Sequence, residues 1–287
     1  MTNVGTCGIV GNGFIGRTLY KAFTKANLDV KQYDINPELS KNPLEEVANC
    51  KYVFICVPTP MNLDTGECFT GIVEKACTSV RQHSKDSILV IKSTIPPGTT
   101  YRLNLHFGKV LFCPEFLTEA NPYEDFVNSN SHMVGFSTED TRKYAESLIN
   151  DVFVKMYTQG VIVSSQTYCV FSTHAEMCKY MRNTYLATRL SYFTEMKQIC
   201  DKLDIDFDIT KFLAGLDERV GNHYNRIDEE EPEYSGSCLP KDINGLICFA
   251  EKMGVDPKVL KASWAKNLEV AKKKTWESLP GRAFIKE

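Results

Sequence analysis

The sequence has few of the features that mark metal sites, disulfide frameworks and membrane spans. Only five histidines occur among 287 residues, without an H-E-x-x-H pair or the Cys/His spacing of a zinc site, so we predict no metal. The eleven cysteines are odd in number and scattered, and no C-x-x-C pair occurs, so we expect reduced thiols. Apolar runs such as YVFICV are too short to cross a bilayer.

Neither sign of charge dominates the chain. The 33 basic and 36 acidic residues leave a net charge of -3, so the basic surface that nucleic acid or an anionic membrane requires is lacking. The first residues have no basic start of a signal peptide. We therefore expect a soluble cytoplasmic protein with no nucleic-acid or membrane partner, long enough for two domains.

Short apolar runs alternate with helical patterns between residues 5 and 165. The runs that read as strands are TCGIV, DVKQYD, KYVFICV, SILVIKS and KVLFC. Continuous apolar strands separated by helices are typical of a parallel sheet covered on both faces. This pattern predicts an α/β fold with an N-terminal Rossmann-like, doubly wound parallel sheet over residues 1–168.

Long helical periodicity follows this region. Ser172 or Thr173 is a plausible N-cap for a helix that runs from Ala175 towards Lys202. Further helices are expected in DITKFLAGLDE, PKDINGLICFAEKMG and DPKVLKASWAKNLEVAKKK. We therefore expect an all-α domain over residues 169–287, joined to the first domain by the long helix.

A glycine pattern follows the first predicted strand. In GIVGNGFIG, Gly11 permits a tight turn, Gly13 allows close approach of a pyrophosphate, and Gly16 lets helix and strand pack closely. Asp34 ends the second strand, where a carboxylate accepts hydrogen bonds from the adenosine ribose and repels a 2′-phosphate, so NAD is favoured over NADP. The predicted cofactor-binding residues of this segment are Gly11, Gly13, Phe14, Ile15, Gly16 and Asp34. The alternative is a turn that only closes a βα unit, with Asp34 as a surface cap.

One cysteine has unusual neighbours. Cys238 lies in YSGSCLPKDING, a Gly/Ser turn ahead of Pro240, which suits the first position of a helix. A helix N-terminus and a cation such as Lys241 both lower a thiol pKa, which activates a nucleophile. A thiolate that traps an aldehyde as a thiohemiacetal permits a second oxidation to a thioester, which water converts to an acid. The alternative is a small buried apolar residue.

The cysteine segment resembles the motif of UDP-glucose dehydrogenases and related nucleotide-sugar dehydrogenases. Segments that occur in the same order in that family are VPTP, KSTIPPGTT, CPEFLTEA, AEMCKYMRNTYLATRLSYFTE, DERVGNHYN and GSCLPKD. The resemblance covers essentially the whole chain, and it is more specific than the glycine pattern.

The resemblance implies roles for individual residues. It implies catalytic roles for Cys238 as covalent nucleophile, Lys179 and Asn183 as stabilisers of the oxyanion, Asp242 and Thr94 as holders of a water, and Glu119 as base. It places Thr59 and Lys241 at the cofactor. It places Glu115, Phe116, Leu117, Arg219 and Tyr224 at the substrate, with Arg219 acting across a subunit boundary. A carboxylate buried there would have a raised pKa.

Each of these residues also has a simpler interpretation. Lys179 with Glu176 fits a solvated pair on a helix, and Glu115 with Glu119 fits a solvated acidic pair. Other simple interpretations are an exposed helix residue for Asn183, a strand end for Thr94, a first-turn charge for Asp242 and a surface charge for Arg219.

The sequence also departs from the family pattern. Family members usually continue into a UDP-binding domain that this chain does not include, and RIDEEEPEY, whose acids would repel a diphosphate, replaces a glycine-rich aromatic loop. Ala120 replaces an expected glycine, and a Pro/Arg pair is missing near residues 130–132. Three alternatives follow from these departures. Either a separate UDP-binding domain completes the site, or the substrate is held differently, or activity is weak. In this family the long helix forms the dimer interface, so the resemblance implies a homodimer.

The favoured hypothesis is NAD-dependent oxidation of the C6 alcohol of a nucleotide sugar, UDP-glucose to UDP-glucuronate, by two hydride transfers. One rival is a two-domain β-hydroxyacid dehydrogenase, which performs one oxidation and does not use Cys238. Another is a non-catalytic NAD-binding or subunit-interaction relative.

Overall fold

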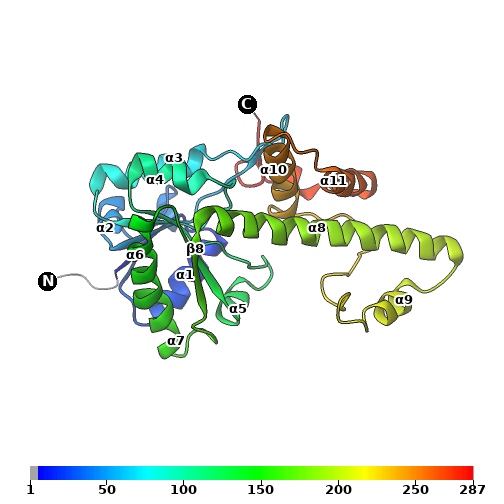
Figure 1. Ribbon diagram of the computed structural model, residues 1–287, viewed down its shortest axis with the longest axis horizontal. Coiled ribbons are helices and arrows are strands. Elements are labelled where there is room, and N and C mark those ends of the chain that lie inside the picture. The colour runs from blue at the N-terminus through cyan, green and yellow to red at the C-terminus, as the bar shows by residue number, and fades with distance from the viewer. Residues whose placement is uncertain (1–5, 287) are drawn as a thin grey trace. The chain divides into compact units, whose positions relative to one another are not determined.

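A computed structural model gives the structure of residues 6–286, which form two compact units (Figure 1). The first unit contains the chain up to Thr59 together with Thr70–Lys179. The second contains Pro60–Phe69 together with the chain from Tyr180 onward. A ten-residue excursion therefore leaves the first unit and returns to it.

The first unit is built on a seven-stranded sheet. Its strands, in spatial order, are β2 (Val30–Tyr33), β1 (Cys7–Val10), β3 (Tyr52–Ile55), β5 (Ile88–Ile91), β6 (Val110–Phe112), β7 (His132–Phe136) and β8 (Thr167–Phe171). The first five of these are parallel, as predicted. The sheet also contains two strands that were not among the predicted runs: β7 runs antiparallel to β6, and β8 runs parallel to β7. Apolar patterning predicts burial of a strand but does not encode its direction.

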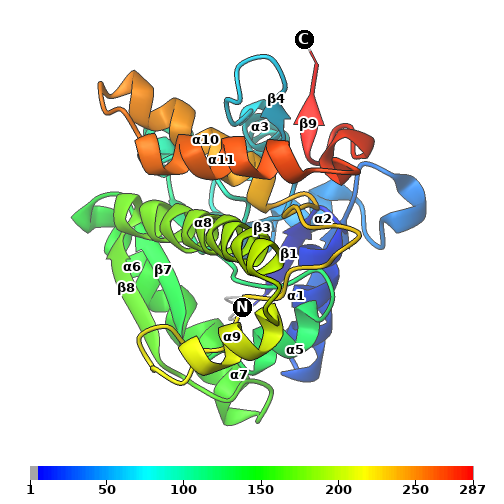
Figure 2. The ribbon, with the colours of Figure 1, turned by 90° about the vertical axis from the view of Figure 1, so that its right-hand side faces the viewer.

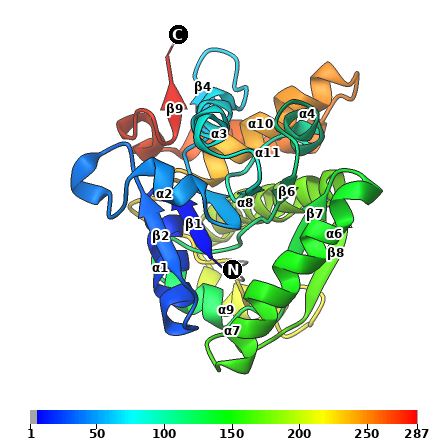
Figure 3. The ribbon, with the colours of Figure 1, turned by 90° about the vertical axis from the view of Figure 1, so that its left-hand side faces the viewer.

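Helices cover both faces of this sheet. They are α1 (Phe14–Lys25), α2 (Leu44–Ala48), α3 (Gly71–His83), α4 (Thr99–Phe107), α5 (Pro122–Val127), α6 (Glu139–Leu148) and α7 (Lys155–Thr158), with a 3-10 turn at Pro37–Leu39 and a π-helical turn at Ile149–Val154. Figure 3 shows α6 beside β7 and β8. Helix α3, with the sequence GIVEKACTSVRQH, is one of the helical patterns expected between the predicted strands.

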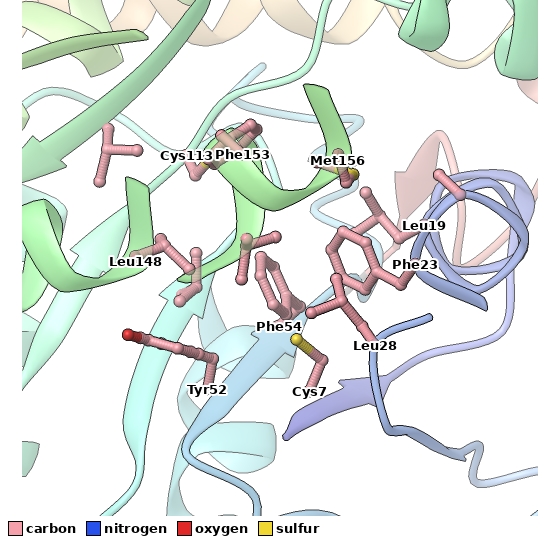
Figure 4. Close-up of a cluster of buried hydrophobic side chains, with 14 of the residues drawn as sticks. Cys7, Leu19, Phe23, Leu28, Tyr52, Phe54, Cys113, Leu148, Phe153 and Met156 are labelled. Atoms are coloured by element: carbon pink, nitrogen blue, oxygen red, sulfur yellow. The ribbon is translucent and has the colours of Figure 1, made fainter. Parts of the chain in front are cut away.

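Successive strand residues point to opposite faces, so each strand contributes to two cores. Tyr52 and Phe54 pack with residues of α1, α6 and α7 (Figure 4). Val53 and Ile55 pack with residues of α2, α3 and α4. Burial on both faces explains why these strands are continuous apolar runs.

The second unit is mainly helical. Its elements are α8 (Ser172–Leu203), which begins in the first unit, α9 (Phe207–Ala214), α10 (Leu239–Lys252), α11 (Lys258–Val270), a 3-10 turn at Thr275–Ser278 and the parallel pair β4 (Met61–Asn62) and β9 (Phe284–Ile285). Figure 2 shows α11 alongside α10. The predicted fold, a Rossmann-like sheet followed by a helical domain with a long helix, is confirmed. Across the described residues, no helix is both long and apolar enough to span a membrane.

The Pro60–Phe69 excursion contacts α10 through side chains of that helix. The Cys248 thiol donates to the Thr65 carbonyl at 3.3 Å, and Lys252 forms an ion pair with Glu67. Gly66 has φ +74°, and a Cβ there would lie 3.2 Å from the Cβ of Asn244. The excursion thus braces the helix whose N-terminus follows Cys238.

Candidate functional site

The glycine turn between β1 and α1 is built for close backbone approach. Gly11 has φ +100°, and a Cβ on Gly16 would lie 1.9 Å from the Gly11 carbonyl oxygen, so side chains are excluded at both positions. A Cβ on Gly13 would have no atom within 4 Å. Helix α1 begins at Phe14 with no side-chain cap and no acidic residue in its first turn. The turn therefore has the open space and the positive helix end that a pyrophosphate requires.

Asp34 follows β2 and lies against this turn. Its Oδ2 accepts a hydrogen bond from the Asn12 N–H at 2.6 Å, and its Oδ1 accepts one from the Asn36 N–H at 2.8 Å. A carboxylate accepts about four hydrogen bonds, so capacity for ribose hydroxyls remains. These residues fit NAD.

Two predicted threonines lie in segments that follow neighbouring parallel strands. Thr59 follows β3 and Thr94 follows β5, and both are buried. The Ser93 hydroxyl donates to the Val57 carbonyl at 2.6 Å, which ties the two segments together. Both threonines therefore lie at the edge of the sheet where Gly11 also lies, which is where open α/β sheets bind ligands.

Glu115 and Lys179 form a buried ion pair. Lys179 Nζ lies 3.1 Å from Glu115 Oε1 and donates to the Glu115 carbonyl at 2.7 Å. The side chains are 4% and 6% exposed, so the interpretations as solvated pairs with Glu176 and with Glu119 are wrong for Lys179 and Glu115. Burial alone would raise the pKa of Glu115, but Lys179, the Leu117 N–H and Lys92 hold it below its ordinary value. The expectation of a raised pKa is therefore wrong for Glu115.

The rest of this segment surrounds the pair. The Leu117 N–H donates to Glu115 Oε2 at 2.6 Å, and the Phe116 ring centroid lies 5.4 Å from Lys179 Nζ. Glu119, the predicted base, is exposed.

Glu176, which the sequence suggested only as a surface partner of Lys179, is fully buried. It accepts hydrogen bonds from the Gly98 N–H at 2.6 Å, the Thr100 N–H at 2.7 Å and the Thr100 hydroxyl at 2.5 Å. It thereby caps the N-terminus of α4 from the second turn of α8. The only sequence signal was an acid among apolar residues at a helix start.

Cys238 is the N-cap residue of α10 and is partly exposed. No side chain caps this helix, and the Ser237 hydroxyl lies 3.7 Å from Cys238 Sγ. Because α10 begins at Leu239, Pro240 occupies the second helical position, not the first as predicted. Both positions lack an intrahelical N–H partner, so the proline is tolerated at either.

Asp242, four residues after Cys238, contacts two other predicted site residues, Asn183 and Lys241. Its Oδ2 accepts from Asn183 Nδ2 at 2.5 Å, and its Oδ1 lies 2.5 Å from Lys241 Nζ. Asp242 and Asn183 are buried, so the interpretation of Asn183 as exposed is wrong. Burial alone would lower the pKa of Lys241, but Asp242, Cys238 and Cys68 hold it above its ordinary value. A protonated cation therefore lies near the Cys238 sulfur.

The two remaining predicted substrate residues differ in environment. Tyr224 has φ +52°, unusual for a bulky residue, and burial together with the nearby Cys238 raises its pKa. Arg219 is 89% exposed and pairs with Asp217 at 2.6 Å, as the surface-charge interpretation anticipated.

The acidic loop ahead of Cys238 is held by lysines and backbone donors. Glu231 pairs with Lys273 at 2.5 Å, and Glu233 accepts from the backbone N–H groups of Lys272 and Lys273. Glu229 lies 3.5 Å from Lys197. These contacts offset much of the negative charge that was expected to repel a diphosphate. In residues 6–286, no three His, Cys, Asp or Glu side chains gather as a metal ion would require.

Comparison with known proteins identifies the family. The model of the NAD binding domain of the UDP-glucose/GDP-mannose dehydrogenase family matches residues 38–156, and that of the family's central domain matches residues 173–269. The UDP-glucose 6-dehydrogenase of Rickettsia typhi is 31% identical over 223 residues, which are 75% of this chain and 48% of that protein. UDP-glucose 6-dehydrogenase YwqF of Bacillus subtilis is 28% identical over 75% of this chain and 48% of its own length. The chain thus spans about half the length of these relatives.

Solved structures agree with this assignment. A UDP-glucose dehydrogenase from Pyrobaculum islandicum superposes with a TM-score of 0.80 at 25% identity, over 93% of this chain and 68% of that one. A 3-hydroxyisobutyrate dehydrogenase from Mycobacterium tuberculosis superposes with a TM-score of 0.71 over 93% of both chains, but at 14% identity it shows a shared fold alone. The chain therefore belongs to the UDP-glucose/GDP-mannose dehydrogenase family, of which it carries the NAD-binding and central domains.

Proposed function

We propose that this chain oxidises the C6 primary alcohol of a nucleotide sugar, UDP-glucose, to the carboxylate. This oxidation requires two hydride transfers, and bound NAD would accept the hydride in each of them. The observation that carries this proposal is the arrangement at the start of α10, where Cys238 precedes a helix N-terminus and Asp242 is bound by both Lys241 and Asn183.

We further propose that residues 1–168 act as the NAD-binding domain and residues 169–287 as the central domain. The two family matches, which end at residue 156 and begin at residue 173, support a boundary in this region, although β8 extends the sheet of the first unit to Phe171. Gly13 and the first α1 residues Phe14 and Ile15 would hold the pyrophosphate, and Asp34 the adenosine ribose. Thr59 and Lys241 would contact the remainder of the cofactor.

In the first oxidation, Lys179 and Asn183 stabilise the alkoxide at C6. They are spaced one turn apart on α8, so an ammonium and an amide donor serve one oxygen. Loss of the hydroxyl proton and of a hydride from C6 leaves an aldehyde. Asp242 and Thr94 hold a water close to that carbon.

In the second oxidation, Cys238 acts as the nucleophile. Its sulfur adds to the aldehyde carbon, the carbonyl oxygen takes a proton, and a thiohemiacetal forms. Loss of a second hydride and a proton leaves a thioester. Water activated by Glu119 adds to the thioester, and collapse of the adduct releases the acid and the thiol. Glu115, Phe116, Leu117, Tyr224 and Arg219 would contact the substrate.

The test is the number of NADH molecules formed per UDP-glucose consumed. Two are expected, together with UDP-glucuronate, because the cysteine route completes two oxidations. One NADH per substrate would favour a β-hydroxyacid dehydrogenase. No turnover with UDP- or GDP-sugars, with or without an added UDP-binding domain, would favour a non-catalytic NAD-binding relative.

We also propose a homodimer formed through α8. An exposed apolar stripe supports it, with Met181, Tyr185, Tyr192, Ile199 and Leu203 each between 46% and 63% exposed. Their spacing of four and seven residues places them on one side of the helix. Such a stripe is normally covered by a partner.

Charge on the stripe should dissociate this dimer. The double variant Tyr192→Lys/Ile199→Lys is expected to be monomeric by light scattering at micromolar concentration, because it brings two pairs of ammonium groups into the interface. Val259→Lys makes the same kind of change at an exposed apolar position on α11 and should leave the assembly unchanged. A dimer that survives the double change would place the interface elsewhere.

A further inference from the structure

Lys92 is a buried ammonium group to which neither the sequence nor the proposed mechanism gives a role. It follows β5 directly and is 3% exposed. Its Nζ donates to the Pro114 carbonyl at 3.1 Å and to Cys113 Sγ at 3.5 Å. Packing does not account for it, because a methionine fills similar space without the desolvation cost of several kcal/mol that a buried cation carries.

The contacts of Lys92 and Lys179 converge on one short segment. Lys92 donates to the Pro114 carbonyl and Lys179 to the next carbonyl, that of Glu115. One lysine extends from the sheet and the other from α8. Two successive peptide groups are therefore fixed by two ammonium groups, and the side chain between them is Glu115.

The charges around this segment do not cancel. Two lysine side chains contact this segment, which carries one carboxylate, and burial keeps the neighbouring Cys56 and His132 side chains uncharged at neutral pH. Burial raises the pKa of Cys56 to about 12. Burial, with a contribution from Lys92, lowers the pKa of His132 to about 4. The Cys113 thiol is a hydrogen-bond partner of Lys92.

We infer that Lys92 is a positioning residue that fixes the Cys113–Glu115 segment and supplies the second positive charge holding Glu115 ionised and paired with Lys179. Lys92 contributes to the low pKa of Glu115. The contacts with Glu115 hold the Lys179 ammonium group in place, and Lys179 is the proposed stabiliser of the oxyanion. The effect on turnover rests on the proposed function, whereas the effect on Glu115 does not.

The direct test is an NMR titration of Glu115 in protein labelled with ¹³C at the glutamate carboxyl groups. The Glu115 signal is the one that disappears in Glu115→Gln. In Lys92→Met its midpoint should move to higher pH, because one of the positive charges that hold the pKa of Glu115 low is removed while Lys179 and the Leu117 N–H remain. The control Lys75→Met, at an exposed position on α3, should leave it in place. An unmoved midpoint in Lys92→Met overturns the inference.

Turnover provides a second readout. In Lys92→Met, kcat should fall on the order of tenfold, and the acidic limb of the pH profile of kcat should move to higher pH. The KM for NAD should stay within about twofold, because the change acts on the transition state rather than on cofactor binding. Equal losses at all pH values would indicate a merely structural role and overturn the inference.

Lys92→Arg decides the question if Lys92→Met does not fold. The guanidinium keeps the charge, so the Glu115 midpoint should match that of the unaltered protein, and a raised midpoint overturns the inference. If the unaltered protein turns over no nucleotide sugar, the proposed function fails, but the Glu115 titration still decides the role of Lys92.

Discussion

Cys238→Ser is expected to abolish formation of the sugar acid while leaving NAD affinity nearly unchanged. A serine hydroxyl at this position is far less ionised than a thiol, so the aldehyde is not trapped and the second oxidation stops. The rate of UDP-glucuronate formation should fall by about 10³-fold or more, equivalent to about 4 kcal/mol in barrier height. The glycine turn and Asp34 are unaltered, so titration with NAD should give the same affinity.

The chain offers a matched control on the same helix. Cys248 lies on α10 and donates to the Thr65 carbonyl, a contact that a serine hydroxyl can also make. Cys248→Ser should therefore keep its activity. Sugar acid formed by Cys238→Ser at the rate of the Cys248→Ser control would exclude the covalent role, and loss of NAD binding in Cys238→Ser would show that the change disturbs the fold.

Local pattern was sufficient to predict much of the fold. The strands buried on both faces, such as Tyr52–Ile55, were visible as unbroken apolar runs, and α8 was visible as a helical period, although it begins at Ser172, three residues before the predicted start at Ala175. The direction of β7 and the pairing of Met61 with Phe284 could not be predicted from local pattern. Both depend on contacts between residues far apart in the chain, and periodicity carries no information about these.

The candidate site shows the same difference between features set by local sequence and features set by long-range contacts. Gly16 was predictable because its role is local and steric. The pairing of Glu115 with Lys179 was not, since a charged residue in a sequence gives no sign of its burial. Glu176 and Lys92 were missed for the same reason. Their partners are mostly backbone groups, which every residue has, so no particular residue type marks the contact.

Glu176 leads to a prediction of pH-dependent stability. Burial raises the pKa of Glu176 to about 7 from an ordinary value of 4.5, although its three hydrogen-bond donors act in the opposite direction. The folded chain therefore holds this proton more tightly than the unfolded chain does. Its stabilising effect is complete below about pH 4.5 and is lost as pH rises through about 7, with a total of roughly 3 kcal/mol for this shift.

Glu176→Gln should remove this dependence, because glutamine does not titrate. The free energy of unfolding, measured by urea denaturation at intervals between pH 5 and 8, should fall with rising pH less steeply in Glu176→Gln than in the unaltered chain. The variant should also be less stable at pH 5, because its amide NH₂ replaces one acceptor that faces the Gly98 and Thr100 donors. Glu45→Gln makes the same change at an exposed position on α2 and should keep the slope of the unaltered chain. Equal slopes in the two variants would mean that Glu176 titrates alike in the folded and unfolded chains, and that its carboxylate caps α4 at no cost from burial.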